Sequence, residues 1–458
     1  MDSQTPGYDQ IGTVWLPLPH WLMLPLVRRD GLWRSGLAGA IPSAACFVLA
    51  GMFLFAATRR LFSSTAAAAA ATALFTLNPN LLYLQTTPMT EPAFLACLMA
   101  MLYFTVRYRA TRGWGALLGA ALAACLATLA RYEAWLLLPF AAGYCCLAAK
   151  RRKAIAGAVF FLVACLGPVY WLFHHWWLTG DALAFYRNQW SARAIQQGLP
   201  YPGKDDWRLA WLYYRTAAQL CAGPVLPLLA IAGAAAALAR RIVWPLALLA
   251  LPGVLVIWAM HSSGGTPIFV PTLPPNSYYN VRYGLAVLPL LALASAALVA
   301  ILPPRLQTPW AVLAVAAAVI PWLLHPSPAN WAVWEEGHHN DEARREWARQ
   351  AAAFLGPRYV RGSGIVSRSG TMIAIYRQLG IPIREVFTID NGLLWQAAIE
   401  RPELWLRQEW AVAEGGDPVQ SAVNRLALHG PCYRLEQSIT VKNAPVIEIY
   451  HRVGGACP

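Results

Sequence analysis

The sequence predicts a polytopic α-helical membrane protein of about ten spans, followed by a smaller α/β domain at the carboxyl end. Hydrophobic residues make up 58% of its 458 residues and charged residues only 13%, against about 25% charged in soluble domains. Apolar runs long enough to cross a bilayer recur through the first 325 residues. Beyond Pro326 the composition changes to short helical and β-rich segments in alternation.

Ten apolar runs are expected to form transmembrane helices, because about 20 residues at a rise of 1.5 Å cross a hydrocarbon core of about 30 Å. They lie at 36–58, 65–83, 91–107, 114–130, 133–149, 154–178, 218–239, 242–260, 283–302 and 309–325. The second run is interrupted by Asn78-Pro79-Asn80. Broken backbone at membrane depth is tolerated where it lines a protein interior, so this interruption is expected to face other helices.

Five short connectors between these runs are basic and set the topology. Together they carry twelve Lys or Arg and no acid, at 59–60, 107–112, 150–153, 240–241 and 305. Short basic loops stay in the cytoplasm. The alternate connectors, and with them all eight carboxylates of residues 1–325, are then extracytoplasmic. The net charge of +14 lies entirely in this half of the chain, so it reflects topology and not nucleic-acid binding.

Three domains are expected. Residues 1–35 form an amphipathic segment at the outer membrane surface, 36–325 the multispanning domain, and 326–458 a soluble extracytoplasmic α/β domain. In the last, helices are expected at 341–356, 370–379, 391–399 and 418–429, and strands at 364–367, 384–389, 410–413, 432–439 and 446–452. Cys432 and Cys457 lie at the two ends of the segment that contains the last two strands. They could form a disulfide or remain two free thiols.

Ionisable side chains at membrane depth indicate functional sites. Glu91 lies at the outer end of a predicted span, either as a reactive carboxylate or only as a complement to the helix dipole. Arg131 and Glu133 lie together between two spans. The arginine offers a planar fork for phosphate or carboxylate, and the alternative is an internal ion pair with Glu91 or Glu133.

A third polar motif, Asn280 to Gly284, enters a span from the outer side. Arg282 is the only Lys or Arg between Arg241 and Arg305 and lies where topology disfavours a positive charge. A lipid phosphate is the expected partner, with an arginine snorkelling to the interface as the alternative.

Other polar features are weaker. Asp205-Asp206 suggests a solvated turn. His174-His175 with Trp176-Trp177 suggest an aromatic belt at the membrane interface, and His338-His339 are expected to be exposed loop residues. The sequence contains no Walker loop, dinucleotide fingerprint or zinc-binding spacing, which disfavours a nucleotide-driven pump.

In these motifs the sequence resembles the GT-C superfamily of multispanning glycosyltransferases, which includes the protein O-mannosyltransferases and the aminoarabinose transferase of lipid A. The resemblance is to bacterial members of family 39 and of the RgtA/B/C/D-like type. It rests on Trp15 to His20, Asn78 to Pro92, Arg131-Tyr132-Glu133 and Asn280 to Gly284. The family also implies a first transmembrane helix and a catalytic acid soon after it, both of which are expected to be missing ahead of Met1.

The resemblance implies transfer of a sugar from a polyprenyl-phosphate donor to a lipid, glycan or protein acceptor, outside a bacterial inner membrane. Glu91 and Glu133 would be the catalytic carboxylates, and Arg131 and Arg282 would bind the lipid phosphate. Acceptor or sugar contacts would come from Asp9 and Tyr283. No metal ligand is assigned, and use of a divalent metal is left open. The alternatives are an inactive truncated homologue, or a transporter or scaffold for a lipid-linked substrate.

Overall fold

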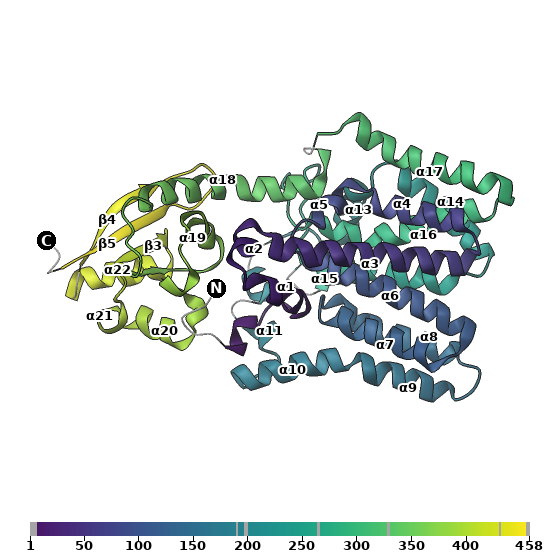
Figure 1. Cartoon of the computed structure of the whole chain (residues 1–458), viewed down its shortest axis with the longest axis horizontal. Helices are drawn as coiled ribbons and strands as arrows, with labels where there is room; N and C mark the ends of the chain where they lie inside the picture. Colours follow the sequence, from purple (N-terminus) through teal and green to yellow (C-terminus); the bar gives the residue numbers. More distant parts are fainter. Residues whose placement is uncertain are drawn as a thin grey trace. The chain divides into compact units, whose positions relative to one another are not determined.

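Every predicted apolar run falls on helices of the computed structural model (Figure 1), which describes residues 7–188, 191–196, 200–262, 266–327, 330–429 and 432–454. Their bounds are α3 Leu37–Phe62, α4 Thr65–Thr76, α5 Pro79–Leu84, α6 Thr90–Thr111, α7 Trp114–Thr128, α8 Glu133–Ala148, α9 Lys153–Ala164, α10 Leu166–Thr179, α13 Trp207–Ala222, α14 Val225–Ala239, α15 Val243–Ser262, α16 Leu288–Ala300 and α17 Pro304–Leu324. The predicted fold class is confirmed.

The helices differ in how completely they could cross a bilayer. Within the described ranges, six are long and apolar enough: Leu37–Phe62, Thr90–Thr111, Lys153–Thr179, Val243–Ser262, Val281–Ala300 and Pro304–Leu324. A bent pair, α13 with α14, would make a seventh. Three of the remaining predicted runs fall on the shorter apolar helices α4, α7 and α8. A further short helix, α1 (Leu18–Val27), precedes them.

The run predicted as one span at 218–239 is divided in the structure. Its first residues belong to α13, and the chain turns by 105° before α14 begins. Gly223 at the turn has φ of 77°, a conformation that glycine adopts without steric cost. Pro224 follows and lacks the N–H that would continue the helix. These two adjacent residues were the sequence signal for the break.

Small residues allow close packing between the helices, as is usual where the surrounding solvent is lipid. The tightest example is the crossing of α14 and α16. A Cβ atom added to Gly233 would lie 1.9 Å from the carbonyl oxygen of Ala294. Alanines fill much of the remaining core, including Ala50, Ala71 and Ala120, all fully buried.

The connectors predicted to be cytoplasmic lie at one end of the helices. The Ser64 hydroxyl, beside the first connector, donates to Gln307 Oε1 at 2.5 Å, two residues beyond Arg305. Trp244, beside Arg240-Arg241, stacks on Tyr144 at 4.2 Å and donates to Thr105. The motifs around Glu91, Arg131 and Arg282 occupy the opposite helix ends.

By their internal contacts the residues form two compact units. The membrane unit contains Ile11–Val27 and Ser35–Glu336, and the sheet unit contains Met1–Gln10, Arg28–Arg34 and Gly337–Pro458. Within the sheet unit, Arg34 of α2 (Asp30–Ser35) donates to the carbonyls of Arg377 and Gly380 at 3.2 and 3.1 Å. The three-domain division expected from composition stays a prediction.

The sheet unit has an α/β fold, as predicted. Five strands, β1 Ile365–Ser367, β2 Val386–Phe387, β3 Trp410–Glu414, β4 Cys432–Ile439 and β5 Ile447–Val453, form one sheet in the order β2-β1-β3-β5-β4. The pairs of β1 with β2 and with β3 are parallel, and the others are antiparallel.

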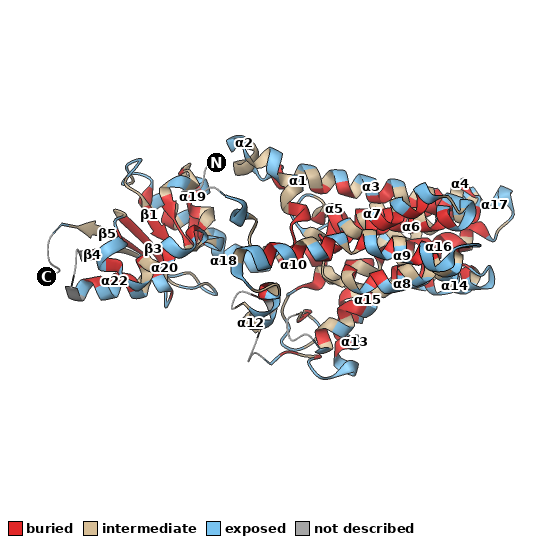
Figure 2. Ribbon diagram, turned by 90° about the horizontal axis from the view of Figure 1, so that it is seen from below, coloured by how far each residue is buried: buried red, intermediate tan, exposed pale blue. Residues whose placement is uncertain are grey.

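Helices of the sheet unit cover both faces of this sheet (Figure 2). They are α19 Ile373–Leu379, α20 Leu393–Glu400, α21 Pro402–Trp405 and α22 Pro418–His429, together with the part of α18 (Ala332–Leu355) that follows Glu336. Trp347 of α18 and Ile375 of α19 pack with Ile365 on one face, whereas Val423 of α22 packs with Val366 on the other. Successive residues of β1 therefore serve two separate cores.

The seven cysteines of the membrane unit are free. Cys457 and the side chain of Cys432 lie outside the described residues, so the predicted choice between a disulfide and two thiols stays a prediction.

Candidate functional site

Glu91 is the second residue of α6 and lies at the centre of a buried polar cluster. Its side chain is 8% exposed. A single oxygen, Oε1, accepts from Arg131 Nη1 at 2.9 Å and from Arg282 Nε at 3.1 Å. The carboxylate also lies in the first turn of its helix, where a negative charge is stabilised by the dipole. The dipole role and the binding of two guanidinium groups therefore coexist.

Arg131 lies in the short turn between α7 and α8 and binds two carboxylates. Its Nη2 and Nε donate to Glu133 at 2.7 and 3.2 Å, a bidentate pair, while Nη1 binds Glu91. Burial alone would lower the pKa of the guanidinium, but Glu133 and Glu91 raise the pKa instead. The arginine is therefore charged, and both ion pairs considered from the sequence are present.

Arg282 is held by a carboxylate from a distant part of the chain. It lies in η2 (Val281–Val287), the 3-10 turn that leads into α16. Besides Glu91, its Nη1 donates to Glu336 Oε1 and its backbone N–H donates to Glu336 Oε2 at 3.1 Å. Glu336 also accepts the backbone N–H of Asn280 at 3.2 Å.

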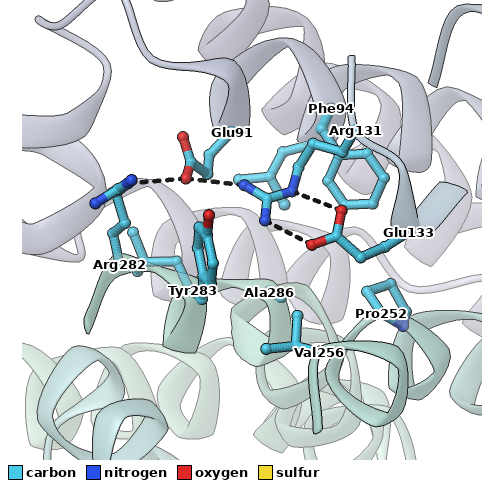
Figure 3. Close-up of a pocket in the computed structure, with 11 residues that line it drawn as sticks. Glu91, Phe94, Arg131, Glu133, Pro252, Val256, Arg282, Tyr283 and Ala286 are labelled. Carbon is cyan, nitrogen blue, oxygen red and sulfur yellow. Dashed lines mark hydrogen bonds and ion pairs between the residues drawn. The ribbon is translucent and has the colours of Figure 1, made fainter. Parts of the chain in front are cut away.

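Tyr283 lies against both arginines. Its ring centroid is 4.4 Å from the guanidinium carbon of Arg131 and 5.2 Å from that of Arg282, which are cation–π distances. Figure 3 shows the continuous chain of contacts from Arg282 through Glu91 and Arg131 to Glu133, with the tyrosine beneath it. The Tyr283 ring therefore contacts both positive charges that Glu91 bridges.

The cluster lines a pocket with little free space. Apolar side chains complete its walls, namely Phe94, Leu95, Pro252, Val256, Leu285 and Ala286. The cavity measures about 20 Å³, which is room for about one water molecule. With the ion pairs formed as they are, a phosphate group does not fit. An anion that binds these arginines must replace a carboxylate.

Neighbouring helices fix the turn that carries Arg131. The Tyr132 hydroxyl donates to the carbonyl of Val14 at 3.0 Å and accepts from Trp171 Nε1 of α10 at 2.9 Å. Leu18 N donates to the Leu129 carbonyl at 2.9 Å. The motif from Trp15 to His20, singled out in the sequence, therefore lies against this turn.

Two further contacts hold the other parts of the cluster. Asn80, fully buried, donates to the carbonyl of Cys221 at 3.1 Å and accepts the N–H of Val333 at 2.9 Å, which anchors the first turn of α18. A Cβ added to Gly284 would lie 2.6 Å from the backbone of Ala217. Only glycine allows η2 to approach α13 so closely.

Of the residues predicted from the sequence, the structure brings together Glu91, Arg131, Glu133, Arg282 and Tyr283. Asp9 is exposed, in the 3-10 turn Tyr8–Ile11, and belongs to the sheet unit. The roles assigned to these six residues stay predictions.

The secondary features lie outside the pocket lining. Asp206 caps α13 by accepting the N–H groups of Arg208 and Leu209. His174 and His175 are buried, while the neighbouring Trp176 and Trp177 are 55% and 68% exposed. Over the described ranges no group of three His, Cys, Asp or Glu side chains has a metal-binding arrangement.

Glu336 was missed as a site residue by sequence reasoning. The sequence signal was an acidic pair, Glu335-Glu336, ten residues beyond the end of the last predicted span. Nothing local distinguishes the two residues, because the difference between them is the contact of Glu336 with a turn 54 residues earlier.

Comparisons with known proteins agree with this architecture. A sequence model of the family described as dolichyl-phosphate-mannose-protein mannosyltransferase matches residues 31–177. No curated protein matches the sequence significantly. The structure of ArnT from Cupriavidus metallidurans bound to undecaprenyl phosphate matches with a TM-score of 0.53 at 13% identity, over 96% of this chain and 88% of that one.

The apo structure of the same ArnT matches with a TM-score of 0.55 at 12% identity, over 95% of this chain and 88% of that one. At such low identity the structural likeness concerns the fold, and the family model adds a sequence relationship through helices α3 to α10. This multispanning membrane chain therefore shares the fold of ArnT, and over residues 31–177 it is similar in sequence to the dolichyl-phosphate-mannose-protein mannosyltransferase family.

Proposed function

We propose that the chain is a membrane glycosyltransferase that moves a sugar from a polyprenyl-phosphate donor to an acceptor on the extracytoplasmic face. One observation carries the proposal. Two buried arginines, Arg131 and Arg282, converge on one carboxylate oxygen at the helix ends opposite the basic connectors. Arginine forks bind phosphate as they bind carboxylate, so the same donors suit the phosphate of a lipid at the outer leaflet.

In the proposed reaction an acceptor hydroxyl oxygen attacks the anomeric carbon, and the bond from that carbon to the phosphate oxygen breaks. The hydroxyl proton passes to a carboxylate, Glu91 or Glu133, and the polyprenyl phosphate leaves with the electron pair. Arg131 and Arg282 stabilise the leaving group's negative charge. Tyr283 and Asp9 are assigned contacts with sugar or acceptor. Attack opposite the leaving group inverts the anomeric configuration.

The fold supports a polyprenyl phosphate as the proposed lipid. The structure of ArnT, whose fold this chain shares, contains bound undecaprenyl phosphate, and apolar helices beside the pocket would suit a polyprenyl chain. The basic connectors favour a bacterial inner membrane orientation with the sheet unit outside. For the sugar and the acceptor we propose only a chemical class. The donor is a polyprenyl phosphate that carries a hexose or a pentose, and the acceptor is a hydroxyl group of a lipid, a glycan or a protein.

Sugar transfer in membranes tests the proposal. Membranes that contain the full chain are incubated with radiolabelled polyprenyl-phosphate sugars, and label in lipid, glycan and protein fractions is counted. Arg282→Ala is expected to lower transfer at least about 100-fold, because removal of one transition-state charge contact costs about 2.7–4 kcal/mol. Glu91→Gln tests the carboxylate.

Arg208→Ala is the matched control, since Arg208 is an exposed arginine on the predicted outer side and is not among the pocket residues. Its transfer rate should equal that of the wild type. Failure of the wild-type chain to transfer label from any donor, with correctly inserted protein present, would reject the enzyme assignment and favour a scaffold or transporter for lipid-linked substrates.

A further inference from the structure

We propose that Asn280 and Arg282 form a built-in anion site for the lipid phosphate, and that Glu336 fills this site when the donor is absent. The inference rests on the proposed function, because the phosphate comes from the proposed donor. Glu336 is thereby a positioning residue that occupies the site and yields Arg282 to the substrate.

Three donors converge on the Glu336 carboxylate. They are the backbone N–H of Asn280, the backbone N–H of Arg282 and the Arg282 guanidinium. Asn280 has φ of 55°, and this left-handed residue before a 3-10 turn directs the two N–H groups toward one anion. Successive N–H groups in such turns make anion-binding concavities, which phosphate occupies as readily as carboxylate.

The turn is fixed independently of Glu336. The buried side chain of Asn280 donates to the carbonyl of Pro267 at 2.8 Å. The carbonyl of Val281 accepts from the Cys221 thiol at 3.3 Å. The donors would therefore remain in place if the carboxylate left, which is the condition for an anion to replace it.

Charge and space favour replacement over addition. Three carboxylates, Glu91, Glu133 and Glu336, face two guanidinium groups, so the cluster already has an excess of negative charge. The remaining cavity of about 20 Å³ holds no phosphate group. A donor phosphate added to the intact cluster would meet both a clash and uncompensated charge.

Glu336 is the carboxylate placed to leave. Glu91 and Glu133 lie in the first turns of α6 and α8, inside the helical bundle. Glu336 is the fifth residue of α18 and the last residue of the membrane unit, while the next residue, Gly337, already belongs to the sheet unit. Glu336 thus lies at the boundary of the membrane unit, whereas the other two carboxylates lie within it.

Lipid binding by the purified full chain in nanodiscs tests the inference. Glu336→Gln keeps the shape and one oxygen acceptor but removes the competing charge. It is expected to bind undecaprenyl phosphate at least about tenfold more tightly than the wild type, a change of about 1.4 kcal/mol. Undecaprenol, which lacks the phosphate, should bind equally to both. Glu335→Gln, one residue away and outside these contacts, is the matched control.

Two further arms separate the explanations. Glu336→Asp retains the competing charge and should bind undecaprenyl phosphate within about threefold of the wild type, which a general loosening of α18 would not produce. Inorganic phosphate should compete more effectively in Glu336→Gln than in the wild type, because the site recognises the headgroup. Transfer by Glu336→Gln should show a lower KM for the donor, without a rise in kcat.

Binding of undecaprenyl phosphate to a folded Glu336→Gln protein with wild-type or weaker affinity would overturn the inference. That result is distinguishable from failure of the proposed function. Tighter lipid binding without any sugar transfer would retain the anion site and reject the transferase, whereas transfer without tighter binding would do the reverse.

Discussion

At the scale of single residues, the pocket is governed by how charges are shared. Arg131 contacts two carboxylates, and its removal would leave both Glu91 and Glu133 buried without that partner. An uncompensated buried charge costs far more than the ion pair gains. The stabilities contributed by the charged side chains of the pocket therefore depend on one another and cannot be assigned to each side chain separately.

This dependence predicts strong coupling between Arg131 and Glu133. Arg131→Ala alone should destabilise the protein by about 3–5 kcal/mol, seen as a lower midpoint of thermal unfolding in detergent. The double variant Arg131→Ala, Glu133→Gln should recover part of that loss, because one of the two stranded charges is gone. Additive effects of the two substitutions would show that the residues do not act as a pair.

A second carboxylate, Glu385 in the sheet unit, has a role that depends on pH. Burial alone would raise its pKa, but hydrogen bonds from the Tyr359 hydroxyl at 2.6 Å and the Gly362 N–H at 2.9 Å outweigh burial and lower the pKa. A lowered folded-state pKa stabilises the protein above the unfolded value of about 4.3 and ceases to do so as pH falls through the folded value.

Glu385→Gln should therefore weaken the sheet unit at pH 7 and matter little in acid. The expected loss at pH 7 is about 1 kcal/mol, or about fivefold faster hydrogen exchange in peptides covering 359–367. The comparison uses the full chain, with rates corrected for the intrinsic pH dependence of exchange. A difference between variant and wild type that is as large at pH 3.5 as at pH 7 would contradict the assignment.

At the scale of elements, the close approach of two helices can depend on a single glycine, which has no side chain. At Gly233 the obstacle to a methyl group is backbone of α16, which cannot rotate away. At Gly143 of α8, in contrast, an added Cβ meets nothing within 4 Å. The two glycines lie in similarly apolar helices and differ in what faces them.

This contrast gives a matched pair of substitutions. Gly233→Ala should push α14 from α16 and lower stability by more than about 1–3 kcal/mol, the usual cost of overpacking. Gly143→Ala should be neutral or slightly stabilising, because alanine is the better helix former. Thermal unfolding in detergent measures both. Equal midpoints for the two variants would show that the α14–α16 crossing is looser than described.

Elements were also the scale at which the sequence was most informative. Apolar runs predicted most helices of the bundle but not α1, and β-rich runs predicted all five strands, because both depend on local periodicity. Glu91, Arg131 and Arg282 were found for a similar reason, since a charge beside an apolar run is visible locally. The bend at Gly223 has a local signal in Gly223-Pro224, whereas the partnership of Glu336 with Asn280 depends on a tertiary contact, which local patterns do not encode.

At the scale of the whole molecule, the basic connectors are expected to determine which end of the bundle faces the cytoplasm. The contact of Ser64 with Gln307 brings two of them, at 59–60 and 305, to the same end. The polar pocket lies at the other helix ends. The expected sidedness thus depends on charges far from the site that they would orient.

Reporter fusions test this orientation in bacterial cells. Green fluorescent protein joined after Arg152 should fluoresce, because that connector is expected in the cytoplasm. Alkaline phosphatase joined after Gly180 or after Pro458 should be active, because both points are expected outside, where its disulfides form. The opposite pattern would place the pocket and the sheet unit in the cytoplasm and remove the basis for an outer-face reaction.

The contact between Tyr132 and Trp171 relates the turn that carries Arg131 to a position along α10. Trp177 lies six residues further along α10, about 9 Å outward at 1.5 Å per residue. Exposed tryptophans settle at the level of the lipid headgroups. Arg131, next to Tyr132 in the chain, is therefore expected to lie below that level, so the phosphate of the proposed lipid donor would have to dip into the membrane to reach it. The rate of the proposed reaction should then vary with bilayer thickness, since thicker lipids move the headgroups away from this arginine.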